Sequence, residues 1–207
     1  LVAEVIDARI PISSRNPDID ELVGDKPRLI ILNRADQADP EQTRAWTRWF
    51  KTRGYAVLET DSKTGGGVNQ FSAVIKDAHK EQIARWREKG QVGRPVRVMV
   101  VGVPNVGKST FINKVAKRKS AKAGDRPGVT RGKQWVSVDA GMDLLDTPGI
   151  LWPKFDDETT GLHLAFTGAV RDEVMDSEEL AASLLELLRV QIHQSYIINI
   201  NYLMMIK

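Results

Sequence analysis

The strongest constraint on the fold comes from residues 96–110, where an apolar, valine-rich run leads into a glycine-rich turn. The turn from Gly102 to Ser109 reads Gly-x-x-x-x-Gly-Lys-Ser, and apolar residues at helical spacing follow it. A strand, a glycine-rich turn and a helix in this order are typical of a phosphate-binding loop, because backbone N–H groups and the helix N-terminus attract phosphate. The pattern therefore predicts a nucleotide site in an α/β fold.

Individual residues of this loop have predicted roles. Lys108 is expected to contact the β- and γ-phosphates, and Ser109 to bind Mg²⁺. We also expect Lys108 to be partly exposed, so that little core packing depends on it. The other loop residues predicted to contact nucleotide are Asn105, Val106, Gly107 and Thr110. The simplest alternative, a chance glycine-rich loop, leaves the flanking strand and helix unexplained.

Apolar strands alternate with helices along most of the chain, which predicts a mainly parallel, six-stranded sheet covered on both faces. A helix starting at Pro40 carries Trp46, Trp49 and Phe50 at a spacing typical of core packing. A single helix is predicted from Phe71 to about Lys89. The expected strands are residues 2–6, 28–32, 55–58 and 96–101, with a hairpin formed by 134–138 and 142–145.

The character of the chain changes after Pro153, so we expect two regions. Residues 1–155 are predicted to form the nucleotide-binding domain, and residues 156–207 a small, truncated helical part with helices near 159–170 and 177–188. The first strand starts almost at Leu1, so we expect that the natural N-terminus lies upstream. The sequence has no cysteine, which excludes disulfides, and no apolar stretch of membrane-spanning length.

Two polar clusters follow predicted strands and favour guanine over adenine. Residues 33–36 read Asn-Arg-Ala-Asp, and Asp36 can accept from both N1–H and the N2 amine of guanine, whereas adenine has no matching pair of donors. Alone, this stretch would more readily be interpreted as an ordinary turn after a strand. The residues after the next strand strengthen the assignment because a backbone N–H there can meet guanine O6: Asp61, Ser62 and Lys63.

The residues around the γ-phosphate follow the hairpin. Asp146 is expected to hold Mg²⁺ through water, and the Gly149 N–H to meet the γ-phosphate. Thr130 is predicted to add its hydroxyl to Mg²⁺ when GTP orders its loop. For Thr130 the alternative is a solvated turn, because the spacing of this motif is loose.

Together these motifs resemble the five signatures of Ras-like GTPases, but in a different order. The base motifs precede the phosphate loop, and Thr130 and Asp146–Gly149 follow it, as in the circularly permuted GTPases. Asp-Ala-Arg-Ile-Pro at residues 7–11 and the phosphate loop resemble the ribosome biogenesis GTPase A family (the YlqF type), over about residues 1–190. The joint presence and order of the motifs make the resemblance specific.

The resemblance implies a function and a set of ligands. It implies a circularly permuted P-loop GTPase fold, GTP or GDP with Mg²⁺, low intrinsic hydrolysis, and a cytoplasmic monomer that acts on a precursor of the large ribosomal subunit and its rRNA. Asn105 matches the position that coordinates K⁺ in potassium-stimulated relatives. Ribosomal particles are expected to stimulate hydrolysis.

The sequence also departs from the family pattern. Arg34 replaces the usual lysine, although its stem can still lie along the base, and Asp61-Ser62 replaces Ser-Ala. Ile150 stands where Ras-like enzymes place a water-orienting glutamine. The family that this chain resembles similarly has a hydrophobic residue at this position. No histidine of this sequence matches the upstream one implicated in hydrolysis, so no catalytic side chain is assigned.

A basic stretch over residues 114–133 surrounds Thr130 and has two readings. It is a solvated loop, or it is an RNA-contacting surface that GTP orders, and the resemblance favours rRNA. Three functions remain compatible with the sequence. They are a ribosome-assembly GTPase, a nucleotide-gated RNA- or protein-binding module with negligible hydrolysis in this truncated form, and a metabolic phosphate-loop kinase. No acceptor site accompanies the loop, which disfavours the kinase.

Overall fold

The computed structural model divides the chain into two compact units, Leu1–Lys154 and Phe155–Lys207, which are described separately. The residues that it describes are 1–116, 134–138, 141–149, 151–152, 158–170 and 176–190.

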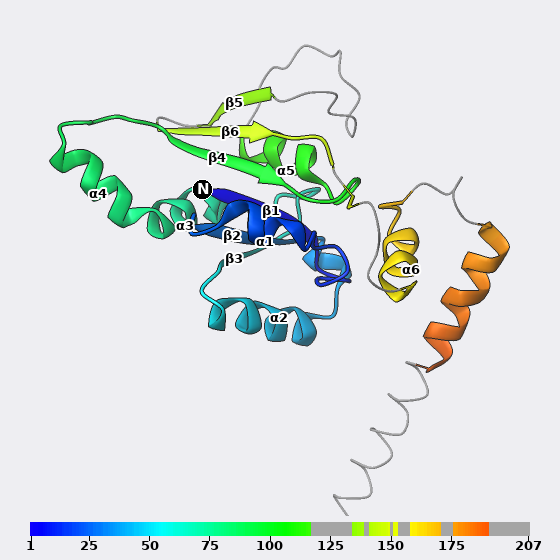
Figure 1. The fold of residues 1–207 in the computed structure, drawn as a ribbon. Coiled ribbons are helices and arrows are strands. Elements are labelled where there is room, and N and C mark those ends of the chain that lie inside the picture. The colour runs from blue at the N-terminus through cyan, green and yellow to red at the C-terminus, as the bar shows by residue number, and fades with distance from the viewer. Residues whose placement is uncertain (117–133, 139–140, 150, 153–157, 171–175, 191–207) are drawn as a thin grey trace, which may run out of the picture. The chain divides into compact units, whose positions relative to one another are not determined.

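The first unit is built on a six-stranded sheet with the order β3-β2-β1-β4-β6-β5 (Figure 1). All neighbouring strands are parallel except β5, which pairs antiparallel with β6. This confirms the predicted α/β, mainly parallel fold. The strands are β1 (Val2–Asp7), β2 (Arg28–Asn33), β3 (Ala56–Thr60), β4 (Val96–Val101), β5 (Gln134–Val138) and β6 (Met142–Asp146).

Helices cover both faces of this sheet. Val2 and Ile6 of β1 pack on α1 and α2, whereas Phe71 of α3 and Phe111 of α5 meet edge to face, 5.0 Å between ring centroids, on the opposite side. The helices are α1 (Asp18–Val23), α2 (Pro40–Thr52), α3 (Phe71–Ala78), α4 (Lys80–Glu88) and α5 (Lys108–Val115), with 3₁₀ turns η1 (Ala35–Gln37) and η2 (Val68–Gln70).

The start and the buried residues of helix α2 could be predicted because neighbouring residues in the sequence specify both. The Asp39 carboxylate accepts from the N–H groups of Glu41 and Gln42, and Pro40 occupies the first helical position, where no N–H is needed. Phe50 is fully buried, and Trp46 and Trp49 pack against its cluster. The prediction that these aromatic residues serve packing is confirmed.

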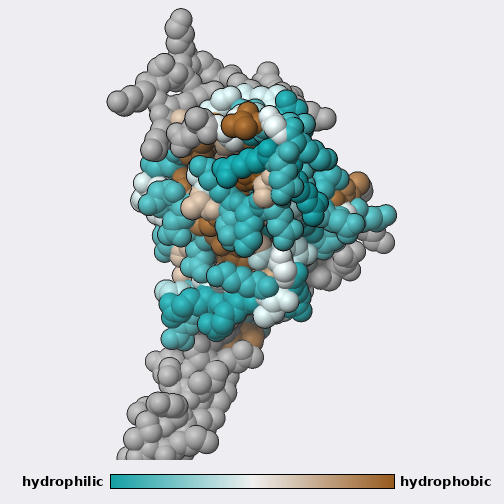
Figure 2. Space-filling model, turned by 90° about the vertical axis from the view of Figure 1, so that its left-hand side faces the viewer, coloured by the Kyte–Doolittle hydropathy of each residue, from teal (hydrophilic) through white to brown (hydrophobic). Residues whose placement is uncertain are grey.

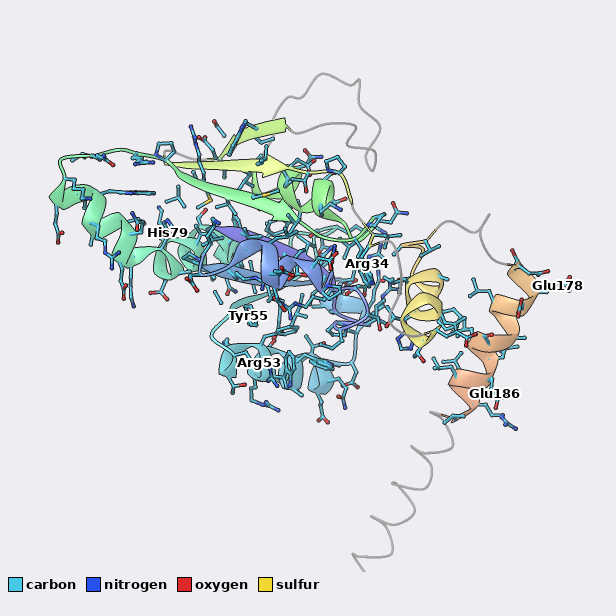
Figure 3. The ribbon with its side chains drawn as sticks, viewed as in Figure 1. Arg34, Arg53, Tyr55, His79, Glu178 and Glu186 are labelled. Carbon is cyan, nitrogen blue, oxygen red and sulfur yellow. The ribbon has the colours of Figure 1, made fainter. Side chains whose placement is uncertain are left out.

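The predicted single helix from Phe71 to Lys89 is wrong, because the chain breaks at His79 into α3 and α4 (Figure 3). His79 lies between them with φ −113°, outside helical values. Phe71 and Ile75 anchor α3 in the core, but α4 has no buried residue. The apolar face that would hold a continuous helix on the sheet therefore ends with α3, and α4 is free to leave in another direction.

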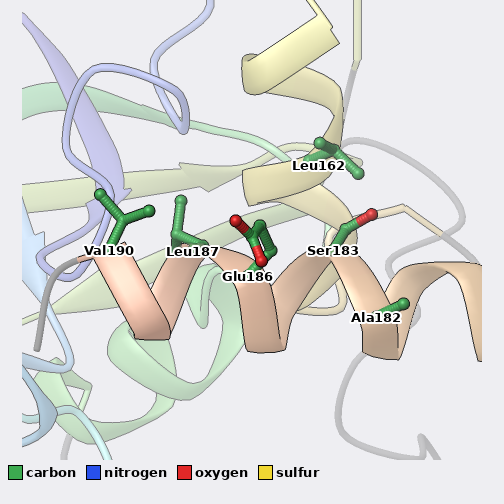
Figure 4. Close-up of a pocket in the computed structure, with 6 residues that line it drawn as sticks. All are labelled: Leu162, Ala182, Ser183, Glu186, Leu187 and Val190. Atoms are coloured by element: carbon green, nitrogen blue, oxygen red, sulfur yellow. The ribbon is translucent and has the colours of Figure 1, made fainter. Parts of the chain in front are cut away.

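The second unit contains α6 (Glu158–Phe166) and a helix over residues 177–190. The Asp176 carboxylate caps the latter helix by accepting from the Glu178 N–H at 2.8 Å. An open groove of about 710 Å³ runs between the two helices (Figure 4). Its lining consists of Leu162, Ala182, Ser183, Glu186, Leu187 and Val190. No described helix in either unit is long and apolar enough to cross a bilayer.

Candidate nucleotide-binding site

Polar residues meet where the parallel strands end. Asp7, Asn33 and Thr60 are the last residues of β1, β2 and β3, and they lie side by side in register. The phosphate loop follows β4, and Asp146 closes the neighbouring strand β6. The carboxyl edge of an open parallel sheet is where such folds bind ligands. The topology therefore gathers motifs that are far apart in the sequence.

The phosphate loop approaches its neighbours so closely that two glycines are required. Gly107 has φ +101°, and a Cβ there would lie 2.5 Å from the Asn33 amide nitrogen. Gly149 lies against the loop, since a Cβ there would be 2.9 Å from the Lys108 ammonium and 2.6 Å from the Cα of Pro104. Larger residues at these positions would push the base motif and the Asp146–Gly149 motif away from the loop.

Lys108 is buried, with 6% of its surface exposed, which corrects the prediction of a partly exposed side chain. Its ammonium donates to the carbonyl oxygens of Gly102 at 3.0 Å and Val103 at 2.8 Å. The loop thus closes around the side chain and supplies acceptors itself. Burial lowers the pKa of Lys108 to about 8, against the opposing attraction of Asp146.

This pKa leads to a pH prediction. A bound phosphate favours the charged ammonium, so above about pH 8 binding must be accompanied by proton uptake. Titration of this group should leave GTP affinity nearly constant up to pH 7.5 and lower it by about fivefold between pH 8 and 9. Calorimetric titration across this range measures it. Lys108→Arg keeps its charge and serves as control; an equally steep fall in that variant would contradict the assignment.

The side of the site that is predicted to hold Mg²⁺ is made of oxygen donors. The Ser109 hydroxyl lies 3.2 Å from Oδ2 of Asp146, which is 7% exposed. Thr147, the next residue, donates its hydroxyl to the Val100 carbonyl at 2.7 Å and holds this segment on the end of β4. A carboxylate and a hydroxyl at this separation are hard ligands of the kind that Mg²⁺ prefers, so the residues present fit the ion.

Asn33 joins the base motif to the phosphate loop. Its amide nitrogen donates to the Val106 carbonyl at 2.7 Å. Its oxygen accepts from the Thr60 hydroxyl and from both the N–H and the hydroxyl of Ser62, at 3.1, 3.1 and 2.6 Å. Asn33 is only 2% exposed, so its amide is held by these protein groups rather than by solvent. Asn33 therefore positions three segments of the site relative to one another.

Arg34 makes a second connection to the same loop (Figure 3). Its guanidinium donates to the Asn105 carbonyl at 2.7 Å and lies 3.7 Å from the Asp7 carboxylate. Arg34 and Asn105, with φ 60° and 56°, are the non-glycine residues of left-handed conformation in the described part of the chain. A planar guanidinium can reach both partners at once, which gives a structural reason for arginine at this position.

Asp7 and Arg9 are site residues to which the sequence reasoning gave no role. The Asp7 carboxylate accepts from Arg9 Nε at 2.9 Å and Nη2 at 2.7 Å, and it is 3% exposed. The side-chain hydrogen bond to Asp7 is the largest cause that raises the pKa of Arg9. The sequence signal for Asp7 is a polar residue at the end of an apolar strand, which is the same signal that identified Asn33.

Asp7→Asn should therefore weaken the phosphate loop from a distance. The amide cannot accept from Arg9 and attract Arg34 as the carboxylate does, so the free energy of unfolding should fall by about 1–3 kcal/mol. GTP and GDP affinities should fall by one common factor, because Arg34 holds a loop that both nucleotides use. Urea denaturation and nucleotide titration measure these changes, with exposed Asp25→Asn as control. A loss confined to GTP would refute this role.

Of the residues assigned to the base, Asp36 and Lys63 are exposed, whereas Asn33 and Ser62 are buried. Asp36 lies exposed in η1, directly after the anchored Asn33 and Arg34. Asp61 folds residues 61–66 into a tight turn by accepting from the N–H groups of Lys63 and Thr64, at 2.8 and 3.2 Å. The hydrogen bond from the Thr64 hydroxyl is the first cause that lowers the pKa of Asp61.

Several predicted residues stay untested as ligands. Asn105 and Thr110 are exposed on the loop and its helix, and Val106 is buried. Thr130, Ile150 and residues 117–133 of the basic stretch lie outside the described residues. The site assignments for these positions remain predictions.

Comparisons with known proteins agree with this geometry. The sequence profile of a family described as "50S ribosome-binding GTPase" matches residues 97–201. The chain is 49% identical over 181 residues to Ribosome biogenesis GTPase A of Bacillus cereus, covering 87% of this chain and 61% of that protein. It is 47% identical over 204 residues to the Priestia megaterium protein of the same name, covering 96% of this chain and 71% of that protein.

Solved structures give the same result. The chain matches GNP-bound YlqF from T. maritima with a TM-score of 0.66 and 30% identity, covering 93% of this chain and 70% of that one. GDP-bound YlqF matches with a TM-score of 0.61 and 31% identity, over 86% and 66% of the two chains. The chain thus spans about 61–71% of the first two curated relatives. On this sequence and structural similarity, the chain belongs to the ribosome biogenesis GTPase A family.

Proposed function

We propose that this protein binds and hydrolyses GTP and serves as an assembly factor for the large ribosomal subunit, acting in the cytoplasm as a monomer. The observation that carries the proposal is the direct junction of base motif and phosphate loop, through Asn33 to Val106 and Arg34 to Asn105. This junction holds a guanine-reading carboxylate at a fixed position relative to the phosphates. The names of the relatives, ribosome biogenesis GTPase A, support the ribosomal role.

Base recognition follows from the exposed carboxylate. Asp36 accepts from N1–H and the N2 amine of guanine, and the backbone around Ser62 and Lys63 donates to O6. In the structure the Ser62 N–H donates to Asn33 and the Lys63 N–H donates to Asp61, so a donor to O6 would exchange one of these bonds when the base binds. An adenine base would leave the Asp36 carboxylate without donors, which disfavours ATP.

On the phosphate side, the loop amides and Lys108 hold the β- and γ-phosphates. The ammonium exchanges its bonds to the Gly102 and Val103 carbonyls for phosphate oxygens, which repays its desolvation. Ser109 and Asp146 would hold Mg²⁺, which supplies charge stabilisation to the phosphates when bound. The Gly149 N–H then meets the γ-phosphate, and Thr130 completes the switch.

Hydrolysis is expected to be slow for the isolated protein. Ile150 has no polar atom in its side chain and cannot orient the attacking water, so transition-state charge must be stabilised in another way. By the family resemblance Asn105 matches the position that coordinates K⁺ in potassium-stimulated relatives, and we expect K⁺ and ribosomal particles to accelerate turnover. Single-turnover assays with and without particles separate this function from a binding module with negligible hydrolysis.

The GTP state is proposed to bind rRNA through the basic stretch around Thr130. Replacing Lys117, Arg118 and Lys119 together with glutamine should weaken association with the particle in GTP and flatten its salt dependence, by nearly one log–log unit per lost contact. GTP affinity should stay near that of the parent. If the triple variant binds the particle like the parent, the stretch is only a solvated surface.

Sedimentation with large-subunit precursors tests the function as a whole. The protein should co-sediment with precursors in GTP, and much less in GDP or without nucleotide, because GDP cannot order the switch. Mature subunits serve as the control. Equal co-sedimentation under all three conditions would contradict a GTP-dependent assembly factor.

A further inference from the structure

Helix α4 differs from the other helices of the first unit because none of its nine residues is buried. It forms the left-hand end of the view in Figure 1, and Figure 2, turned to face this side, shows a mainly hydrophilic surface. A helix without a buried face contributes little to the core. Its surface chemistry is therefore the property that needs an explanation.

Positive charge is concentrated on α4 and the segment that follows it. Residues 80–97 contain six basic and two acidic residues, whereas the whole chain has a net charge of only +3. The basic residues are Lys80, Arg85, Arg87, Lys89, Arg94 and Arg97. In the part of the chain that the structure describes, Lys80 is the one member of this set in an ion pair, with Asp77 at 3.6 Å. The other charges remain available to a polyanion.

Two of these arginines are stacked on tryptophans. The Arg94 guanidinium carbon lies 4.7 Å from the ring centroid of Trp86, and that of Arg97 lies 5.3 Å from the ring centroid of Trp135 on β5. Trp135 is 51% exposed. Stacking restrains each guanidinium and leaves flat surfaces on which bases can stack, a combination typical of single-stranded nucleic-acid binding.

The sheet face beside these residues is partly exposed in the part of the chain that the structure describes. Trp135, Leu145 and Met99 lie opposite one another in register across β5, β6 and β4. Met99 is 38% exposed and Leu145 partly exposed, whereas the opposite face, with Val98, Val100 and Leu144, is fully buried. The exposed tryptophan therefore stands on a sheet face beside Arg97, three residues after the Arg94 that stacks on Trp86 of α4.

From these observations we propose a surface that binds single-stranded segments of RNA. It consists of α4, residues 89–95, the start of β4 and Trp135, and is called the α4–β4 surface. The cations would contact phosphates, and Trp135 and the Arg–Trp pairs would stack on bases. An acidic protein or an anionic membrane would use the charges, but neither offers flat bases for the exposed indole. The inference rests on the proposed function only for the source of the RNA.

The position of this surface predicts that it acts independently of the nucleotide. β4 runs from Val96, at the α4 end of this surface, to Val101 at the phosphate loop, a separation of about 17 Å. The surface contains no residue assigned to the nucleotide. It would therefore hold RNA in both the GTP and the GDP state, whereas the switch region would respond to GTP alone.

The test uses fluorescence anisotropy with a labelled single-stranded RNA of about 20 nucleotides, across a KCl series in GTP and in GDP. The variant Arg85→Gln, Arg87→Gln, Lys89→Gln should lower the salt slope by up to about two log–log units, equally with either nucleotide. Trp135→Ala should lower affinity about tenfold with an unchanged salt slope. The far-ultraviolet circular dichroism of both variants should match the parent.

A matched control removes the same number of exposed charges from α2: Arg44→Gln, Arg48→Gln, Lys51→Gln. This helix also carries an Arg–Trp pair, but its Trp49 packs against the core cluster, whereas Trp135 is 51% exposed. The control should keep most of the RNA affinity. An equal loss in the control, or an unchanged affinity in the α4 variant, would overturn the proposal.

Two further measurements separate the remaining explanations. Polyglutamate and vesicles of anionic phospholipid should bind the parent less tightly than RNA does. The affinity for these two probes should not depend on Trp135. If they bind as tightly as RNA or more tightly, the surface is merely cationic and the stacking of RNA bases is refuted. GTP titration of the α4 variant should give the parent affinity. Failure of the parent to bind GTP would defeat the proposed function, while the RNA result would still decide this inference.

Discussion

Lys108→Ala is expected to remove tight GTP binding while the protein remains folded. The ammonium would make charge-assisted bonds to two phosphates, each worth about 1.5–3 kcal/mol. Affinity should therefore fall by a factor of about 10² to 10⁴. The loss should be larger for GTP than for GDP, because the γ-phosphate contact exists only with GTP. Calorimetric titration with both nucleotides measures it.

The effect of Lys108→Ala on stability is expected to be small for a specific reason. The variant loses two bonds to the carbonyls of Gly102 and Val103, but it also loses the desolvation that depresses the pKa of the buried ammonium. These opposing contributions should leave the free energy of unfolding within about 1–2 kcal/mol of the parent. Exposed Lys51→Ala on α2 is the control. Unchanged GTP affinity beside an unaltered melting curve would show that this loop is not the phosphate site.

Asp36→Asn is expected to change which base the protein selects. The amide keeps one acceptor but places a donor where guanine presents its N2 amine, so at least one charge-assisted bond of about 1.5–3 kcal/mol is lost and two donors face each other. GTP affinity should fall by about 10² or more. Xanthine carries a carbonyl oxygen in place of that amine, so affinity for xanthosine triphosphate should rise in the same variant.

Competition between GTP and xanthosine triphosphate measures this exchange of specificity. Asp25→Asn removes an exposed carboxylate elsewhere, serves as control and should keep guanine selectivity. Unchanged GTP affinity in Asp36→Asn would remove the assignment of the base site. A loss of GTP affinity without any gain for xanthosine triphosphate would indicate that the loop had moved.

Much of the fold was predictable because its signals are local. The strand, glycine-rich turn and helix around Lys108 follow from neighbouring residues, and so does the start of α2 at Asp39 and Pro40. The break at His79 was missed because the polar and apolar spacing of residues 71–88 is compatible with one helix. Only packing on the sheet distinguishes α3, which has a buried face, from α4, which has none.

The sequence by itself predicted the kind of site: a phosphate loop, a carboxylate proposed to read guanine and an aspartate proposed to hold Mg²⁺, each recognisable from a few adjacent residues. The tertiary structure decided how they are joined. Asn33 reaches Val106 across 73 residues and Arg34 reaches Asn105 across 71, through side chains anchored by Asp7 and Ser62. Such contacts depend on which strands become neighbours, and strand order results from the burial of the whole sheet rather than from any local pattern. The burial of Lys108 has the same origin, since the loop carbonyls that enclose it are positioned by the strands behind them.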